Sequence, residues 1–233
     1  MEDDLLVRLL KLMEDVGPDQ RIPSERELVV QWETSRTALR HRLRMLEAMG
    51  ALERRGAAGT YTRTVKPHDV AAALKIGLHS SALSSASAFQ PVRVALERQA
   101  AKMAAEDFKP IPVAHAEDAV MRMEKSTSPD ALYAADLDFH HAIFQASGNA
   151  ALIFFSTAVG DLIADSVSSR RSRMLRLAND VDEMRVLHRA ILEAIKAKDP
   201  ASAMAAMDMH FDRIDSLEIE TPSSLPLADE SIQ

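Results

Sequence analysis

Hydrophobic residues recur at helical spacing along most of the chain. The first such stretch predicts an amphipathic helix that ends before Pro18, with an apolar stripe formed by Leu5, Leu6, Leu9, Leu10 and Met13. A second clear stripe consists of Leu39, Leu43 and Leu46, which stand at i, i+4 and i+7 and therefore share one face of a helix. Gly50 supplies the C-terminal stop of that helix.

A shorter helix is expected between these two stripes. Ser24 is followed three residues later by Glu27, which is the spacing of a capping box at a helix N-terminus. This helix is predicted to end near Trp32, and a polar turn connects it to the leucine-striped helix over about residues 36–49.

Two short extended segments follow the third helix. Residues 51–54 and 61–63 flank a loop that contains Gly56 and Gly59, and this pattern predicts a β-hairpin. Three helices followed by a small hairpin are typical of a winged helix-turn-helix domain. We therefore predict such a domain in residues 1–66.

Beyond residue 67 the pattern predicts helices only. They are separated by proline residues and by a Gly-Asn pair, and they cover about residues 69–77, 80–89, 91–107, 113–125, 130–147, 149–172, 181–197 and 200–217. This gives a second, all-helical domain over residues 67–217 and a polar, frayed tail over 218–233. The predicted fold class is mainly α.

The composition narrows the class of protein. The 233 residues include no cysteine, which excludes a disulfide-stapled scaffold, a thiolate zinc finger and a cysteine nucleophile. No apolar run approaches the roughly 20 residues that span a bilayer. The acidic N-terminal stretch also lacks the basic region of a signal peptide. We therefore expect a soluble, cytoplasmic protein that has no membrane partner.

The net charge of -7 is unevenly distributed along the chain. Residues 20–66 contain 10 Lys and Arg against 5 Asp and Glu, whereas residues 67–233 contain 16 basic and 24 acidic residues. A basic N-terminal region on an acidic body indicates local binding of nucleic acid.

Three arginines lie on the third predicted helix beside its leucine stripe. Arg36, Arg40 and Arg44 stand at i, i+4 and i+8, so burial of the leucines turns their guanidinium groups outward together. Such a ridge suits a recognition helix, because arginine binds guanine edges or phosphates through paired hydrogen bonds. Arg26 and Ser35 are further candidates for contacts to the DNA backbone. The alternative is a solvated basic face, which the adjacent capped helix and hairpin disfavour.

Three segments carry a family resemblance. Residues 17–28 read GPDQRIPSEREL, residues 35–37 read SRT, and residues 39–50 read LRHRLRMLEAMG. Together they resemble the N-terminal domain of GntR-family transcription regulators, over nearly all of residues 5–65.

The GntR resemblance implies roles for individual residues. It implies that Arg26, Arg36 and Arg40 contact DNA, with Thr37 in the same motif, and that Gly59 belongs to the wing.

The chain also departs from the GntR pattern. Ala57 and Ala58 stand near the wing tip where the family usually has a glycine and a basic residue, which leaves Arg54 and Arg55 as candidate wing contacts. Glu33 replaces the glycine usual in the turn between the second and third helices.

Three histidines stand within apolar stripes on three different predicted helices. They are His140, His188 and His210, and Asp136 lies one turn before the first of them. A single histidine on an apolar face is more often a satisfied core residue. Three of them with an aligned carboxylate favour a shared cation, because burying each polar ring separately is costly. This donor set suits Zn²⁺, with Ni²⁺ or Mn²⁺ as alternatives.

The helical region carries a second resemblance. Its signatures are Arg93-x-x-x-Glu97, Asp136-x-x-Phe139-His140, Gly148-Asn149, His188-x-x-Ile191 and His210. They are similar to the FCD ligand-binding domain of the FadR subfamily of GntR regulators, over about residues 70–217, and they fill all four positions of its metal-containing branch. The resemblance implies a small organic or sugar acid as effector, bound beside the metal.

Arg93 and Asn149 are the candidate effector-binding residues. The alternative for Arg93 is an ordinary surface ion pair with Glu97, worth about 0.2–0.5 kcal/mol. A cluster of Arg170, Arg171 and Arg173 is a further candidate for binding an acid.

The sequence thus predicts a DNA-binding transcription regulator, more specifically a repressor. It is expected to bind a palindromic operator as a homodimer, with one winged helix on each half-site, and to respond to a small carboxylate effector. Two alternatives use the same Asp and His set. A metal-dependent enzyme is disfavoured because no His-Glu-x-x-His arrangement supplies a general base, so we expect no enzyme. A pure metal sensor stays open.

Overall fold

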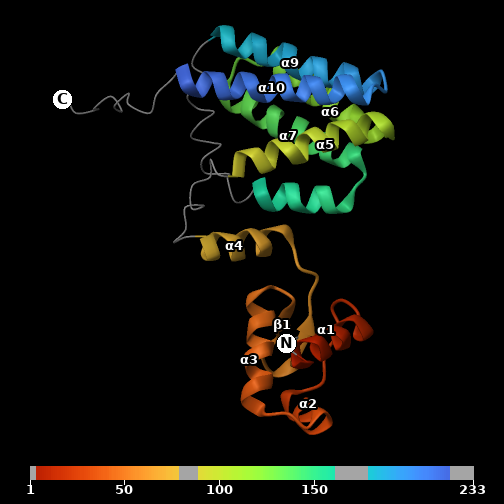
Figure 1. Cartoon of the computed structure of the whole chain (residues 1–233), viewed down its shortest axis with the longest axis vertical. Coiled ribbons are helices and arrows are strands. Elements are labelled where there is room, and N and C mark those ends of the chain that lie inside the picture. Colours follow the sequence, from red (N-terminus) through yellow and green to blue (C-terminus); the bar gives the residue numbers. More distant parts are fainter. Residues whose placement is uncertain (1–3, 79–88, 161–177, 221–233) are drawn as a thin grey trace, which may run out of the picture. The chain divides into compact units, whose positions relative to one another are not determined.

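The computed structural model describes residues 4–78, 89–160 and 178–220 (Figure 1). The chain divides into two compact units, residues 1–84 and residues 85–233. The helix expected over 80–89 lies almost wholly outside the described residues, as do the second half of the one expected over 149–172, the Arg170, Arg171 and Arg173 cluster, and most of the predicted tail. Within the described part, no helix combines the length and apolarity needed to cross a membrane.

The first unit contains the predicted three helices and hairpin. Its elements in chain order are α1 (Asp4–Val16), α2 (Glu25–Trp32), α3 (Arg36–Ala48), β1 (Leu52–Arg54), a 3₁₀ turn η1 (Gly56–Ala58), β2 (Thr60–Thr62) and α4 (Pro67–Leu78). The two strands are antiparallel, with Leu52 opposite Thr62. The winged helix-turn-helix fold is therefore confirmed.

The start of each helix in the helix-turn-helix follows from a serine cap. The Ser24 Oγ accepts a hydrogen bond from the Glu27 N–H at 3.3 Å, and Glu27 Oε2 accepts one from the Ser24 N–H at 2.7 Å, so the predicted capping box forms. Ser35 caps α3 in a similar way, because its Oγ accepts the Ala38 N–H at 3.1 Å. The leucine stripe of α3 is buried against Leu9 of α1 and Leu28 of α2.

Glu33 closes α2 in a left-handed backbone conformation. Its φ and ψ are +49° and +41°, and its N–H donates to the Val29 carbonyl. A residue with a Cβ is strained in this region, whereas glycine is not. The presence of Glu33 in place of the family's usual glycine therefore lowers the stability of the folded first unit.

Replacing Glu33 with glycine is expected to stabilise the first unit. Left-handed backbone costs a non-glycine residue about 1–2 kcal/mol, and the greater freedom of glycine in the unfolded chain offsets about 0.5–1 kcal/mol of the gain. The free energy of unfolding should rise by about 0.5–1 kcal/mol. Urea unfolding followed by fluorescence measures it, since Trp32 is the single tryptophan and packs on this core.

A matched substitution controls for the general effect of glycine. Glu14 is exposed in α1 at a helical position, where Glu14→Gly is expected to cost roughly 0.5–1 kcal/mol. Destabilisation of similar size by both substitutions would contradict the assignment of strain to Glu33.

The end of α3 and the start of α4 are joined by a clasp of polar contacts. Arg63 Nε donates to the Gly50 carbonyl at 2.8 Å, and Arg63 Nη2 donates to Asp69 Oδ1 at 2.5 Å. Asp69 Oδ2 also accepts the Lys66 N–H at 2.8 Å. Gly50 has φ +74°, and a Cβ there would lie 2.1 Å from Arg63 Nη2, so the clasp requires glycine at this position.

The second unit is a bundle of helices. Its described helices are α5 (Gln90–Glu106), α6 (Pro110–Lys125), α7 (Pro129–Ser147), a helix over 150–160, α9 (Ala178–Lys196) and α10 (Pro200–Glu220). Helix α7 packs on α5 and α6, and α10 packs on α5 and α9 (Figure 1). The core includes many alanines on α5 and α6, which allow close approach of the helices, together with large side chains such as Phe139, Ile191 and Phe211.

Helix α6 begins at a proline that the prediction left outside the helix. Helix α6 begins at Pro110 instead of residue 113 and includes Pro112 in its first turn. Proline is tolerated there because the first N–H groups of a helix have no partner within it. The predicted mainly α fold class is confirmed, with the small antiparallel sheet confined to the wing.

Candidate nucleic-acid interface and metal centre

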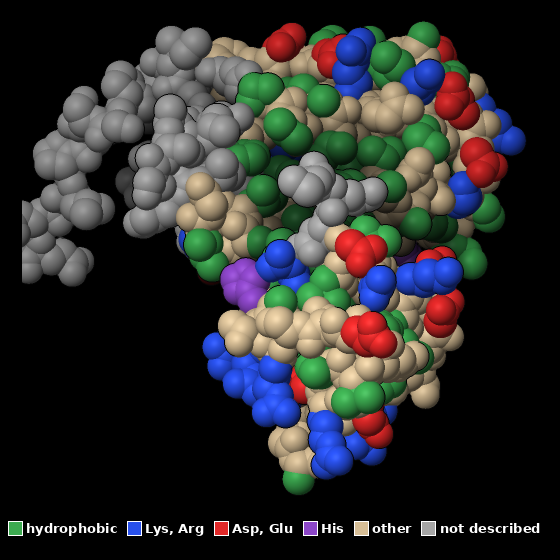
Figure 2. All heavy atoms as spheres, turned by 60° about the horizontal axis from the view of Figure 1, so that its bottom comes forward, with side chains coloured by type: hydrophobic (Ala, Val, Ile, Leu, Met, Phe, Trp, Pro, Cys, Tyr) green, Lys and Arg blue, Asp and Glu red, His purple; other side chains and the backbone are tan. Residues whose placement is uncertain are grey.

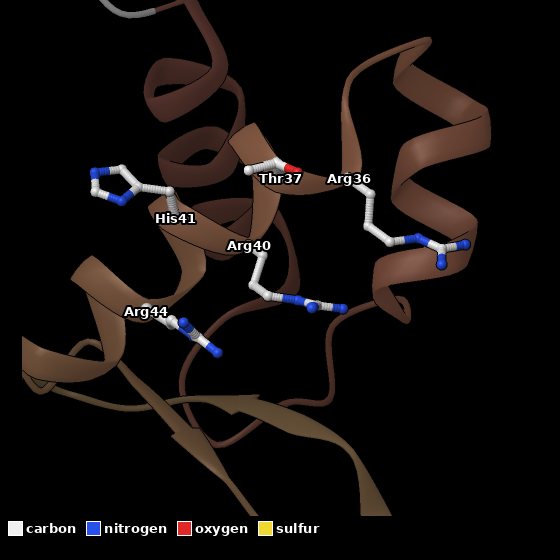
Figure 3. Close-up of a pocket in the computed structure, with 5 residues that line it drawn as sticks. All are labelled: Arg36, Thr37, Arg40, His41 and Arg44. Atoms are coloured by element: carbon white, nitrogen blue, oxygen red, sulfur yellow. The ribbon is translucent and has the colours of Figure 1, made fainter.

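Helix α3 presents a continuous polar groove on the side opposite its leucines. The groove is lined by Arg36, Thr37, Arg40, His41 and Arg44, all of them exposed (Figure 3). In Figure 3 the three arginines extend to one side of the helix and His41 to the other. Figure 2 shows Lys and Arg side chains gathered toward the bottom of the view. The periodic pattern did not single out His41, because a lone exposed histidine carries no sequence signal.

The arginines of this groove differ in their charge balance. Glu25 on α2 binds Arg40 at 3.1 Å and Arg54 of β1 at 3.2 Å. Burial raises the pKa of Glu25, but the hydrogen bonds and charges of these two arginines outweigh it and lower that pKa. Arg36 and Arg44 form no ion pair within the described part of the chain. Their charges are thus the least neutralised on α3.

The wing arginines are held by residues of the same unit. Arg54 also binds Glu47 at 3.3 Å, while Arg55 binds Asp19 at 3.2 Å and Glu53 at 2.7 Å. The Arg55 guanidinium lies 4.4 Å from the centre of the Tyr61 ring. Contact with DNA at the wing would therefore compete with existing ion pairs.

The other DNA-binding candidates occupy distinct positions. Arg26 is exposed on α2, next to the Glu25 carboxylate that orients Arg40. Ser35 caps α3 through its side chain. Gly59 joins η1 to β2 with φ +109°, close to the Arg21 side chain.

The second unit brings the four predicted metal-ligating residues to one buried place. Asp136 and His140 come from α7, His188 from α9 and His210 from α10. Ring nitrogens of the three histidines lie within 4.8 Å of one another, and all three rings are buried. Asp136 Oδ1 lies 3.1 Å from His188 Nε2 and 3.7 Å from His140 Nε2.

The hydrogen bond of His188 suits a metal ligand. Its Nδ1 lies 2.7 Å from the Met184 carbonyl oxygen. Because a carbonyl oxygen only accepts, Nδ1 carries a proton; Nε2 makes no hydrogen bond to any described residue, so in the neutral ring it keeps the free electron pair. Three imidazoles and a carboxylate converge here, and together they form a set of ligand groups that fits a divalent ion such as Zn²⁺.

Arg93 and Glu97 form a buried pair beside the histidines. Arg93 Nε donates to Glu97 Oε1 at 2.6 Å, with the side chains 15% and 3% exposed, so this is no surface pair. Glu97 Oε2 contacts His140 Nδ1. Burial raises the pKa of Glu97, but the charges of Arg93 and His140 outweigh it and lower that pKa to about 2. The Arg93 guanidinium also lies 5.3 Å from the centre of the Phe211 ring.

The two other residues singled out near this site have ordinary partners. Asn149 Oδ1 accepts the N–H groups of Ala151 and Leu152 at 3.0 and 3.1 Å, so Asn149 caps the helix over 150–160. His141 is exposed on α7, outside the histidine cluster, with its ring 3.3 Å from the Gln145 amide.

Two family models match this chain, one in each unit. Residues 9–62 match the family model "Bacterial regulatory proteins, gntR family", and residues 90–213 match the FCD domain. A relative from Escherichia coli (strain K12), with the provisional name of L-lactate dehydrogenase operon regulatory protein, is 28% identical over 218 residues, covering 90% of this chain and 83% of that protein. The HTH-type transcriptional regulator LutR of Bacillus subtilis (strain 168) is 26% identical over 205 residues, covering 87% and 93%.

A solved structure shows the same fold. The Streptococcus agalactiae GntR structure aligns with a TM-score of 0.64 at 23% sequence identity, over 94% of this chain and 100% of that one. The family models together span both units. The chain therefore belongs to the GntR family of bacterial regulatory proteins, with a C-terminal FCD domain, and is a DNA-binding transcription regulator rather than an enzyme.

Proposed function

We propose that the protein is a cytoplasmic repressor whose operator binding is controlled by a small organic or sugar acid, bound near a divalent metal in the FCD domain. The observation that carries the proposal is the buried convergence of Asp136, His140, His188 and His210. A core of this kind has no structural need for three imidazoles and a carboxylate, and burying them without a shared cation is costly.

The chemistry of the site favours an acid as the effector. A divalent ion held by these four residues would supply positive charge that attracts a carboxylate. Arg93 adds a mostly buried guanidinium near the same point, and its pKa is raised because the charges of Glu97 and Asp136 outweigh the effect of burial. Asn149 stands at the start of the next helix, as the other predicted effector residue.

The names of two relatives support this class of function. The Escherichia coli relative is named for the operon of L-lactate dehydrogenase, whose substrate is a hydroxy acid. The Salmonella newport (strain SL254) relative NanR, 25% identical over 209 residues, is named a transcriptional repressor; these residues cover 86% of this chain and 77% of that protein. By analogy with these relatives, we propose that this protein represses transcription and that it responds to an acid.

The proposed control acts through two states of a homodimer. One state places the two recognition helices on the half-sites of a palindromic operator, and the other does not. The acid can change operator affinity only by the difference between its own affinities for the two states. A ligand with equal affinity for both would leave repression unchanged.

A binding selection followed by an effector screen tests the proposal. DNA is first selected from a random library with the purified protein, and an inverted repeat is the expected product. Mobility shifts on that DNA are then measured with Zn²⁺, Ni²⁺ or Mn²⁺ present and with a panel of hydroxy acids, sugar acids and their neutral amides.

Each outcome of the screen has a definite meaning. A change in operator affinity with one acid, and not with its amide, supports the proposal. If no acid changes binding in the presence of metal, effector control fails. A response to metal alone would identify a pure metal sensor, and a selected site without inverted repeats would contradict the dimer.

A further inference from the structure

We infer that Glu97 is a positioning residue for the metal centre, which holds the proton of His140 on Nδ1 and thereby presents Nε2 of that ring to the ion. The inference rests on the proposed metal-binding function. It assigns Glu97 a task that neither a surface ion pair nor a metal ligand would have.

The first argument is the direction of the contact. Glu97 is 2% exposed on α5, and its Oε2 contacts Nδ1 of His140 on α7. An ionised carboxylate only accepts hydrogen bonds, so the ring nitrogen that faces it carries the proton. The other nitrogen, Nε2, lies 3.7 Å from Asp136 Oδ1, which is beyond hydrogen-bond distance, so in a neutral imidazole Nε2 keeps the free electron pair.

The second argument is that His188 uses the same device from a different element. Its Nδ1 donates to the Met184 carbonyl, and its Nε2 also faces Asp136 Oδ1. Two histidines on different helices therefore have Nδ1 engaged by an acceptor and Nε2 turned to one carboxylate. Metal-ligating histidines commonly show this pattern, because an acceptor on the far nitrogen fixes the ring and its tautomer.

The third argument is the charge balance around Glu97. Its other oxygen accepts from Arg93 at 2.6 Å, which pairs the buried negative charge within hydrogen-bond distance. Arg93 lies in turn against the Phe211 ring, which packs on His140 and His210. A carboxylate matched in this way is a good hydrogen-bond acceptor and a poor competitor for a cation. Asp136 Oδ1 lies instead next to two ring nitrogens, Nε2 of His188 and Nε2 of His140.

Two substitutions separate this role from the alternatives. Glu97→Ala removes the acceptor, and we expect it to weaken Zn²⁺ binding about 10–100-fold. Glu97→Gln keeps one accepting oxygen, and with that oxygen on the Nδ1–H and the contact to Arg93 given up, the variant should retain most of the Zn²⁺ affinity. Glu106→Ala, at an exposed position of the same helix, controls for loss of a glutamate and should bind Zn²⁺ as the unmodified protein does.

The measurements use the full chain and the metal ion itself. Affinity for Zn²⁺ is measured by competition with a chelating dye, and coordination is followed by the visible absorption of bound Co²⁺. The tautomer of His140 is measured in the metal-free protein, at a pH high enough for the ring to be neutral, from the ¹⁵N shifts of its ring nitrogens. We expect Nδ1–H in the unmodified protein and in Glu97→Gln, and loss of that preference in Glu97→Ala.

The possible results are distinguishable. Equal Zn²⁺ affinity of Glu97→Ala and the unmodified protein would overturn the inference. Equal loss in the Ala and Gln variants, with a changed Co²⁺ spectrum, would make Glu97 a ligand and would overturn it as well. If the unmodified protein binds neither ion, the proposed metal function fails, while the tautomer measurement still decides whether Glu97 positions His140. Circular dichroism shows whether each variant is folded, and Glu97→Gln keeps the test decisive if Glu97→Ala is not.

Discussion

Arg36→Ala is expected to weaken operator binding by about 1–3 kcal/mol for each half-site, or roughly 5–150-fold. Arg36 stands at the exposed start of α3, where a recognition helix meets the major groove, and no ion pair within the described residues neutralises it. Fluorescence anisotropy with the selected operator, repeated over a range of salt concentrations, measures both the affinity and its salt dependence.

The salt dependence distinguishes the arginines of α3. Loss of a phosphate contact lowers the slope of log affinity against log salt by about 1. We expect a smaller reduction for Arg40→Ala than for Arg44→Ala, because the Glu25 carboxylate already balances the charge of Arg40. Lys11→Ala, at an exposed position of α1, serves as the control for general loss of charge. Equal effects of Arg36→Ala and Lys11→Ala would refute α3 as the DNA-reading surface.

Saturation with Zn²⁺ is expected to stabilise the FCD domain, and His188→Ala to abolish that gain. An ion at 100 times its dissociation constant adds about 2.7 kcal/mol to the free energy of unfolding, provided that it binds only the folded state. For a domain of this size, that corresponds to a rise in Tm of about 5–10 °C. Thermal unfolding followed by circular dichroism, with Zn²⁺ or with a chelator, measures the difference.

His141→Ala is a matched control for this experiment. It removes a histidine from the helix that carries His140, but from an exposed position outside the cluster. The variant should keep the full Zn²⁺-dependent rise in Tm. Loss of the rise in both variants, or its survival in His188→Ala, would exclude the proposed centre.

Local patterns were sufficient to predict most of the fold. The leucines of α3 point to one core because 3.6 residues per turn places them on one face, and the Ser24 capping box is a contact between residues three apart. The convergence of three histidine-bearing helices was predicted in the same way, since each ring lies within an apolar stripe that must face the core.

The burial of a pair of neighbouring side chains, and contacts between residues far apart in the sequence, could not be predicted from spacing. Arg93 and Glu97 stand one helical turn apart, which fits a surface pair as well as a buried one. The burial of Ala100, Ala101, Ala104 and Ala105 on α5 shows that packing decides which face of this helix turns inward. The pairing of wing arginines with Asp19 and Glu25 likewise depends on tertiary structure.

The clasp around Gly50 determines how movement would be transmitted within the first unit. Arg63 binds the Gly50 carbonyl and Asp69, so the segment between β2 and α4 is fixed by side-chain hydrogen bonds. A rotation of α4 about its first turn must either break a charge-assisted hydrogen bond or turn the end of α3 with it. The proposed recognition helix is thus coupled to α4 at its C-terminal end, while its proposed DNA-binding residues begin at the other end.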